Sequence, residues 1–293
     1  AGLENATRSH FVAQDMMERG VAADKGLVES TGWLARSLLP SREALAGYST
    51  TSNPVFGLKG VPGYLAAPDL AGGLGFPYGD ATRQLLAQWA ERGSEFSKAT
   101  ASALQVIERA SSAVQKGANG KVLPYVPMGS ISYNPGGDFG RRLSAVAQLA
   151  RADIGLKAAW VDFGIWDTHE NQGGRMADLA SRLGGGLAAF FEDMSQAGRP
   201  VVVVALSEFG RRLRANKSNG TDHGHAGVAF VLGAGVRGGR MYGRWPGLET
   251  RQLDQGVDLA VTTDYRAILA GALSLAGLPA MFPGWAGVPL ALG

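Results

Sequence analysis

Apolar and polar positions alternate along the second half of the chain in a way that predicts helices and strands in turn. Residues 139–152 repeat apolar side chains at helical spacing, and residues 176–194 do the same over a longer stretch. Short apolar runs of the buried-strand type cover residues 156–163, 201–207 and 228–235. Strand, helix and strand at this spacing indicate an α/β fold with a mostly parallel sheet and helices on its faces.

The first half is less regular, but it contains two predicted helical regions. Residues 9–19 are expected to form a short helix with Ser9 as its N-cap and Gly20 as its terminator. Residues 81–117 have a helical composition and are expected to form a cap region within one domain that covers residues 1–293. Three glycines, 184–186, interrupt the long helical pattern. Because each costs a helix about 1 kcal/mol, we expect the helix backbone to approach the sheet closely there.

Composition narrows the kind of site. The chain has 293 residues, no cysteine and a formal net charge of +3. Without cysteine, thiolate metal sites and a thiol nucleophile are excluded, so His, Asp and Glu must hold any metal ion. The basic residues are scattered, which favours an anionic small molecule or polymer over nucleic acid as partner. The longest aliphatic run, residues 201–206, is too short to span a bilayer, so no membrane span is expected.

Acidic residues and three of the four histidines follow the predicted strands. In chain order these candidate metal ligands are Asp167, His169, Glu208, Asp222, His223 and His225. Because function in α/β folds collects at the carboxyl ends of the strands, we expect the three loops that carry them to converge. Imidazole and carboxylate are standard ligands for zinc, manganese and similar divalent ions when thiolates are absent, which predicts one or two such ions. The alternative is that the aspartates are turn residues and the histidines are solvated. The fourth histidine, His10, is expected to lie outside the metal site.

The segment "ATRSHF" near the start places Arg8 and Ser9 at a predicted helix N-terminus, where backbone amides favour an anion. Ser9 is a candidate nucleophile there, and the alternative is that it only caps the helix. Arg211, which follows Glu208 closely, is a candidate for clamping an oxyanion, although a surface basic run needs no such role. The fingerprint-like "GAGVRG" is not followed by a helical sequence, which argues against a dinucleotide site. The chain contains no Walker loop and no Gly-x-Ser-x-Gly elbow.

These motifs together resemble the exported bacterial proteins of domain-of-unknown-function family 1501, in the alkaline phosphatase-like superfamily. The resemblance runs along nearly the whole chain in an ordered series: "TRSHFVAQDMMERG", "TGWLARSL", "VDFGIWDTHENQ", "VVVVALSEFGRR", "NGTDHGHAG", "GVRGGRMYG", "TTDYRAIL" and "FPG". It implies a three-layer α/β/α sandwich with a mostly parallel sheet and a site for two metal ions at its carboxyl edge. It also implies a periplasmic or extracellular location.

Carried over residue by residue, the resemblance implies that Asp167, His169 and a histidine of "TDHGHAG" hold one ion. Glu208 would help to hold the second ion, next to Ser9 at about the position of the superfamily nucleophile. The superfamily often has Asp-His where this chain has Glu208-Phe209, a departure at the second site. The superfamily's first strand has no counterpart before "TRSHF". A second polypeptide supplying that strand, or an N-terminally incomplete chain, would account for this.

The sequence therefore favours a metal-dependent hydrolase of phosphate-type esters. Sulfate esters are less favoured, because "TRSHF" does not fit the signature around the nucleophile of the superfamily's sulfatases. The alternative is a non-catalytic exported protein that contains metal and binds an extracellular polymer or a protein partner. Two structural expectations follow. The strand near Val228 should run antiparallel to those of Trp160 and Val203, and the Ser9 hydroxyl should share a crevice with Glu208.

Overall fold

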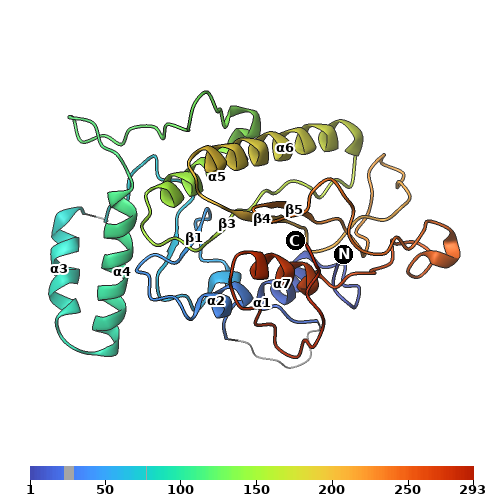
Figure 1. Cartoon of the computed structure of the whole chain (residues 1–293), viewed down its shortest axis with the longest axis horizontal. Helices are drawn as coiled ribbons and strands as arrows, with labels where there is room; N and C mark the ends of the chain where they lie inside the picture. Colours follow the sequence, from blue (N-terminus) through green and yellow to red (C-terminus); the bar gives the residue numbers. More distant parts are fainter. Residues whose placement is uncertain (23–29, 77) are drawn as a thin grey trace. The chain divides into compact units, whose positions relative to one another are not determined.

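The computed structural model of the protein describes residues 1–22, 30–76 and 78–293 and has a mixed α/β fold (Figure 1). Seven α-helices and a small parallel sheet of three strands lie within these residues. The chain divides into two compact units, which are described separately. The first unit comprises residues 1–37, 164–181 and 200–293, and the second comprises residues 38–163 and 182–199.

The second unit contains the parallel sheet. Its strands are β1 (Gly47–Ser49), β2 (Tyr64–Ala66) and β3 (Ala158–Trp160), in the order β2-β1-β3. In the register, Tyr48 of β1 lies opposite Leu65 of β2 and Ala159 of β3. The expected strand at 156–163 is confirmed as β3. The central strand β1 is fully buried, so this sheet forms the core of the unit.

Helices of the second unit occupy the segments that the apolar pattern indicates. They are α3 (Asp80–Ala90), α4 (Glu95–Ser112) and α5 (Gly137–Arg151), with short 3-10 helices η1 (Phe56–Leu58) and η2 (Asn134–Gly136). The helix expected at 139–152 is confirmed as α5. Helices α3 and α4 lie side by side and fall in the segment expected to be helical, 81–117 (Figure 1).

The long helix α6 (Gln172–Gln196) confirms the helical pattern at 176–194 and contains the three consecutive glycines. A Cβ built on Gly185 would lie 2.8 Å from Cβ of Pro135, and one on Gly186 would lie 2.7 Å from Cδ1 of Phe139. The backbone does approach a neighbour closely, but that neighbour is η2 with the start of α5 and not a sheet. The glycines shorten the helix-to-helix distance, which a larger residue would lengthen.

The first unit contains β4 (Val202–Ala205), β5 (Phe230–Gly233), α1 (His10–Arg19), α2 (Trp33–Leu38), the 3-10 helix η3 (Thr250–Gln252) and α7 (Tyr265–Leu275). Strands β4 and β5 pair antiparallel, with Val203 opposite Leu232. The antiparallel orientation expected for these two strands is confirmed. The segment between them contains no helix, and parallel neighbours need a crossover connection that is usually helical.

The expected single sheet differs from the observed pairing. Strand β3 pairs with β1, and β4 pairs with β5, so the described strands form two sheets. The strand near Val228 is expected to run antiparallel to the strand of Trp160. The two strands belong to different sheets, so this part of the prediction does not apply. No helix in the described ranges is long and apolar enough to cross a bilayer.

Helix α1 confirms the helix expected at 9–19, with Ser9 at its N-cap position and Gly20 at its end in the left-handed conformation. Its buried residues include Ala13, Met16 and Met17, which follow helical spacing and face the core. Phe11, in contrast, is 87% exposed. The first turn therefore lies at the surface, where His10 contacts the loops that carry Asp167 and His223.

Candidate metal centre

Three segments of the first unit carry the candidate ligands. They are the start of α1, residues 164–171 before α6, and the loop between β4 and β5. Two isolated antiparallel bridges hold that loop: Arg211 pairs with His223 within it, and Asn219 pairs with Glu170 before α6. The loops are therefore held in a fixed register although no long strand supports them.

Glycines 220 and 224 allow these loops to come together. A Cβ built on Gly220 would lie 2.1 Å from the carbonyl carbon of His169, and one on Gly224 would lie 2.6 Å from that of Arg211. Backbone atoms cannot move aside as the end of a flexible side chain can, so a larger residue at either position would push the loops apart. This close approach accounts for two of the glycines in "NGTDHGHAG".

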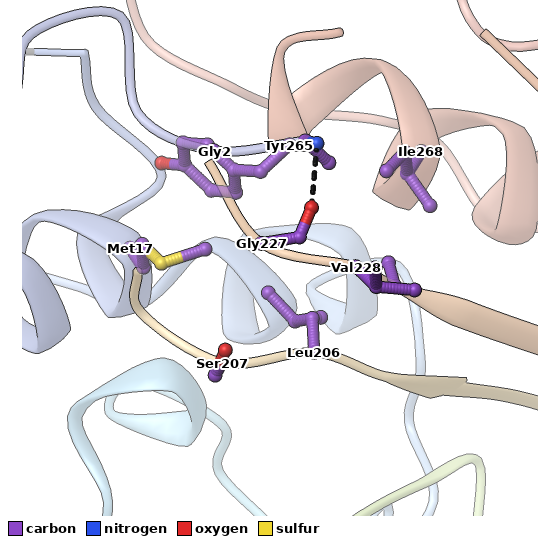
Figure 2. Close-up of a pocket in the computed structure, with 10 residues that line it drawn as sticks. Gly2, Met17, Leu206, Ser207, Gly227, Val228, Tyr265 and Ile268 are labelled. Atoms are coloured by element: carbon purple, nitrogen blue, oxygen red, sulfur yellow. Dashed lines mark hydrogen bonds between the residues drawn. The ribbon is translucent and has the colours of Figure 1, made fainter. Parts of the chain in front are cut away.

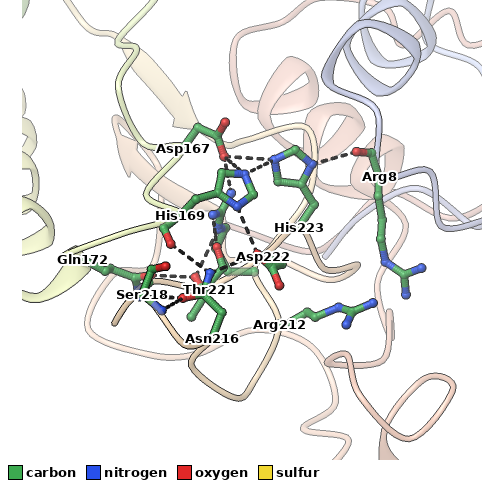
Figure 3. A network of polar contacts seen from close by, with 12 residues as sticks. Arg8, Asp167, His169, Gln172, Arg212, Asn216, Ser218, Thr221, Asp222 and His223 are labelled. Atoms are coloured by element: carbon green, nitrogen blue, oxygen red, sulfur yellow. Dashed lines mark hydrogen bonds and ion pairs between the residues drawn. The ribbon is translucent and has the colours of Figure 1, made fainter.

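The Nε2 atoms of three histidines meet at the carboxylate of Asp167. Nε2 of His223 lies 3.1 Å from Nε2 of His10 and 2.9 Å from Nε2 of His169. Oδ1 of Asp167 lies 2.9 Å from Nε2 of both His169 and His223, and its Oδ2 lies 3.3 Å from Nε2 of His10. Figure 3 shows Asp167, His169 and His223 facing one another. We call these four residues the His/Asp cluster. Within it, His10, Asp167 and His223 form a group that could hold a metal ion.

Each histidine of the cluster places its other ring nitrogen, Nδ1, against an oxygen that can only accept a hydrogen bond. For His10, His169 and His223 in turn, these oxygens are Oε1 of Glu208 at 2.5 Å, Oδ1 of Asp222 at 3.1 Å and the backbone oxygen of Arg8 at 2.7 Å. Nδ1 is therefore a donor in each ring, which leaves Nε2 to bind a cation or, when it is protonated, to donate to Asp167.

The result is an electrostatic arrangement that requires positive charge at its centre. Three Nε2 lone pairs and the anionic carboxylate of Asp167 point at one another, and such groups repel unless a cation or additional protons lie among them. Zinc bonds of 2.0–2.1 Å in tetrahedral geometry place ligand atoms about 3.3 Å apart. The observed separations of 2.9, 3.1 and 3.3 Å are close to this value. His10, Asp167 and His223 therefore fit a divalent ion, and His169 lies beside them.

Asp167 is kept ionised by its neighbours. Burial alone would raise the pKa of its carboxyl group. Hydrogen bonds from Arg211 and His223, together with the nearby His169 and His223 rings, outweigh that effect and hold the pKa well below its usual range. Nη1 of Arg211 donates to Oδ1 of Asp167 at 2.5 Å, while its Nε donates to Oγ1 of Thr221 at 3.2 Å. Arg211 therefore fixes a candidate ligand in place.

Asp222 has the same kind of support one step further from the centre. Nδ2 of Asn216 donates to Oδ1 of Asp222 at 3.1 Å and to the backbone oxygen of His169 at 2.8 Å. The hydrogen bond from Asn216, followed by the one from His169, lowers the pKa of the Asp222 carboxyl group. Asn216 therefore links the two residues, and it was not among the residues predicted from sequence.

The structure brings together five of the six residues predicted as ligands, in two different positions. Asp167, His169 and His223 lie at the centre of the cluster. Glu208 and Asp222 instead contact the Nδ1 atoms of His10 and His169. Carboxylates in that position orient a metal-binding histidine and fix its tautomer. Glu208 and Asp222 thus contact the histidine rings on the side opposite Nε2, where a carboxylate raises the basicity of the ring.

His225 lies apart from the cluster. It is buried, with Nδ1 2.8 Å from Oδ2 of Asp254 and Nε2 2.9 Å from the backbone oxygen of Leu3. Both ring nitrogens are thereby occupied. This placement differs from the predicted role of His225 as a metal ligand. His223 and His225 are two residues apart in the chain, but their side chains contact different partners.

His10 is the histidine that the sequence prediction left outside the site, and the structure corrects this. Its Nε2 lies within the cluster, and its ring contacts those of Phe209 and His223 at centroid distances of 4.8 and 4.4 Å. Its position directly after the "TRS" motif was the available signal. The sequence could not show that α1, which lies more than 150 residues upstream of Asp167, begins next to Asp167 in the structure.

The three residues predicted to act on the substrate have different surroundings. The Ser9 side chain makes no hydrogen bond to cap α1, so capping does not account for it. Arg211 differs from the expected anion clamp, since Nε, Nη1 and Nη2 each donate to Asp167 or Thr221. The Arg8 side chain forms an ion pair with the buried carboxylate of Asp258.

Two hollows of the first unit lie outside the cluster. A cavity of about 10 Å³ lies near Met17, Ser207 and Tyr265 (Figure 2). The amino group of Ala1, which also lines it, donates to the oxygen of Gly227 at 2.9 Å. That volume holds about one water molecule, so the cavity cannot accept a substrate. A wide hollow of about 500 Å³ is bordered by the start of α6 and by Thr221. The cluster itself is partly exposed and open to solvent.

Comparison with known proteins places the chain in a family without giving it a function. The family model described as "Protein of unknown function (DUF1501)" matches residues 78–275, which is more than half of the chain. The match includes Asp167, His169, Glu208 and His223, whereas His10 lies upstream of it. No curated protein and no solved structure matched the chain. The chain belongs to the DUF1501 family.

Proposed function

We propose that the protein is a metal-dependent hydrolase of phosphate-type esters, with sulfate esters less favoured. The observation that carries the proposal is the convergence of three Nε2 atoms on the ionised carboxylate of Asp167, with each Nδ1 held by an acceptor. Ligands that are preorganised in this way, on a partly exposed surface, are typical of sites that bind a metal and react with a solvent-borne substrate.

His10, Asp167 and His223 would hold the ion with His169 beside them, and Glu208 and Asp222 would orient two of the histidines. Bound there, zinc, manganese or a similar ion would neutralise the non-bridging oxygens of an ester and lower the pKa of a nearby hydroxyl group. Ser9 precedes His10 directly and is the proposed nucleophile. Its oxygen would attack phosphorus as the alcohol leaves, and water would then release phosphate and restore the hydroxyl group.

The resemblance to the alkaline phosphatase-like superfamily supports this proposal and extends it. It suggests a three-layer α/β/α sandwich, a second metal ion and an exported protein. For the second ion, Glu208 would have to contribute a ligand in addition to its contact with His10. We propose one ion as the minimum, because a single group of three potential ligand residues occurs in the described ranges.

A non-catalytic metal-containing protein is the second candidate. The observation that favours it is the same single group, together with Phe209 at a position where the superfamily often has a histidine. Such a protein would bind metal in stoichiometric amount and attach to an extracellular polymer or a protein partner without turning over an ester.

Removal of the Ser9 hydroxyl should abolish turnover without removing metal. We expect Ser9→Ala to lower kcat for aryl phosphates by about 1,000-fold or more, because the proposed covalent step then has no nucleophile. The measurement is hydrolysis of aryl phosphates and aryl sulfates with zinc or manganese, together with metal analysis of each purified variant. Ser218→Ala, an exposed serine of the same unit, is the control. Full metal content with no turnover by the wild type would favour the non-catalytic candidate, and unchanged turnover by Ser9→Ala would exclude this nucleophile.

Metal occupancy should fall as the solution is acidified. Metal binds the neutral imidazole ring, and histidine in model peptides titrates near pH 6.5. Protons and the metal ion compete for the same Nε2 atoms, so we expect release of metal below about pH 6. Zinc content after equilibrium dialysis from pH 5 to 8 tests this. Occupancy that does not change over this range would mean that histidines do not hold the ion.

A further inference from the structure

We propose that Arg8 and Arg212 form a second anion-binding site beside the His/Asp cluster, and that the substrate carries a second anionic group which binds there. The binding site stands on its own contacts, while its role in substrate recognition rests on the proposed function. The first observation is that both guanidinium groups meet one buried carboxylate. Nη2 of Arg8 forms an ion pair with Oδ2 of Asp258, and Nε of Arg212 lies 3.9 Å from its Oδ1.

Asp258 is suited to position these arginines. Its side chain is 0% exposed, yet its Oδ1 has no hydrogen-bond partner in the described part of the chain. Nε of Arg8 and Nε of Arg212 are buried and likewise unpaired among the described residues. Buried donors and acceptors without partners are costly, so Asp258 alone does not satisfy the two guanidinium groups.

The arginines, and not Asp258, are the accessible partners at this site. The side chains of Arg8 and Arg212 are 34% and 40% exposed, whereas that of Asp258 is 0% exposed. Asp222 is a further acidic group near Arg212, and its carboxylate is also held by Asn216 and His169. Arg211, by contrast, is paired with Asp167. A dissolved anion can therefore reach the guanidinium groups without displacing the buried carboxylate.

The backbone fixes this pair next to the cluster. The carbonyl oxygen of Arg8 accepts from Nδ1 of His223 at 2.7 Å, and the amide of Arg212 donates to the carbonyl oxygen of Asp222 at 2.9 Å. In Figure 3 both guanidinium groups lie on the side of His223 and Asp222 that faces away from Asp167. An anion held by the pair is therefore a different group from one that reacts at the cluster.

The chemistry of the pair identifies the class of ligand. Guanidinium groups present planar, forked donors that match the oxygens of phosphate and sulfate, often with two hydrogen bonds each. Two such forks around one point suit a tetrahedral oxyanion better than a single carboxylate. The inferred substrates are esters with at least two phosphate or sulfate groups, one at the cluster and one between Arg8 and Arg212.

Titration of inorganic phosphate into the full chain in the presence of a chelator tests the site without any activity. At low ionic strength, where exposed charges are least screened, we expect one phosphate per wild-type chain. Arg212→Gln should weaken binding by about 10- to 100-fold, the range expected when hydrogen bonds to a charged group are lost. Arg214→Gln removes an exposed arginine two residues away and should leave the affinity unchanged.

Two further variants separate this inference from the proposed function. His169→Ala disrupts the cluster and should keep phosphate binding, so loss of binding in that variant would place the phosphate at the cluster and overturn the second site. Absence of binding by the wild type, or equal affinity of wild type and Arg212→Gln, would also overturn it. Thermal unfolding confirms that each variant folds. Arg212→Lys, which keeps the charge but loses the fork, should bind more weakly than wild type and takes the place of Arg212→Gln if the latter fails to fold.

For active protein, the same pair predicts a selective change in KM. Arg212→Gln should raise KM about 10-fold or more for an aryl bisphosphate and should leave KM for the matching aryl monophosphate unchanged. An equal rise for both substrates would mean that Arg212 binds the reacting phosphate, and the second site would be excluded.

Discussion

Replacement of His10 by alanine is expected to lower the affinity for zinc or manganese by more than about 100-fold. Loss of a residue that only holds a ligand typically costs 10- to 100-fold in metal affinity, and His10 supplies a nitrogen at the centre of the cluster, 3.1 Å from Nε2 of His223. The substitution also leaves Glu208 without the histidine that it holds. Calorimetric titration of each ion into the chelator-treated protein at neutral pH measures the effect.

The neighbouring residue provides the matched control. Phe11→Ala alters the same turn of α1 at a side chain that is 87% exposed, and it should retain wild-type affinity. Glu208→Gln should weaken binding by about 10- to 100-fold, because it loses the charge that supports the ring of His10. Equal affinity of His10→Ala and Phe11→Ala would contradict the proposal that the His/Asp cluster binds a metal ion.

The central residues of the cluster could be predicted from sequence because they follow predicted strands in acid-rich loops. Asp167, His169 and His223 satisfy that rule, and the structure brings them together. His10 satisfies no such rule, since it is the first residue of a helix far upstream in the chain. Its part in the site depends on a tertiary contact that local pattern does not encode.

The choice between His223 and His225 shows a different limit. Side chains two residues apart in a loop need not face the same partner, and both histidines have equally acidic neighbours in sequence. The structure decides between them through the bridge that pairs His223 with Arg211 and through the contact of His225 with Asp254. Both are long-range pairings, so the sequence left the two histidines equivalent.

The same distinction applies to the fold. Helices α5 and α6 carry a repeating apolar face over many residues, and periodicity predicted both. Strand β1 has three residues in a segment rich in glycine and proline, too short for a pattern, and yet it is the central strand of the parallel sheet. Which strands share a sheet is set by long-range pairing, and so the division into two sheets could not be predicted.

Asp193 of α6 is the residue on which the stability of the second unit depends most clearly. Its side chain is 0% exposed and accepts from the hydroxyl groups of Tyr125 and Tyr133 at 2.7 and 2.9 Å and from the amide of Met128 at 2.9 Å. Burial first, and then the hydrogen bond to Asp193, raises the pKa of Tyr133, so this hydroxyl remains a donor. Nη1 of Arg151 lies 3.8 Å from Oδ1 of Asp193 and supplies the opposite charge.

Asp193→Ala is therefore expected to destabilise the second unit by about 3–5 kcal/mol. It leaves two hydroxyl donors and one amide without an acceptor, each costing about 1–3 kcal/mol when buried, and removes the partner of a nearby arginine. Glu192→Ala, at the adjacent exposed position where the carboxylate accepts from Gln196, is the control and should change stability by less than about 0.5 kcal/mol. Urea unfolding followed by tyrosine and tryptophan fluorescence gives the midpoint for each variant.

Because the cluster and Asp193 belong to different units, metal affinity measured below the unfolding transition should be the same in both variants. Equal urea midpoints for the two variants would show that the three hydrogen bonds to Asp193 contribute no net stability.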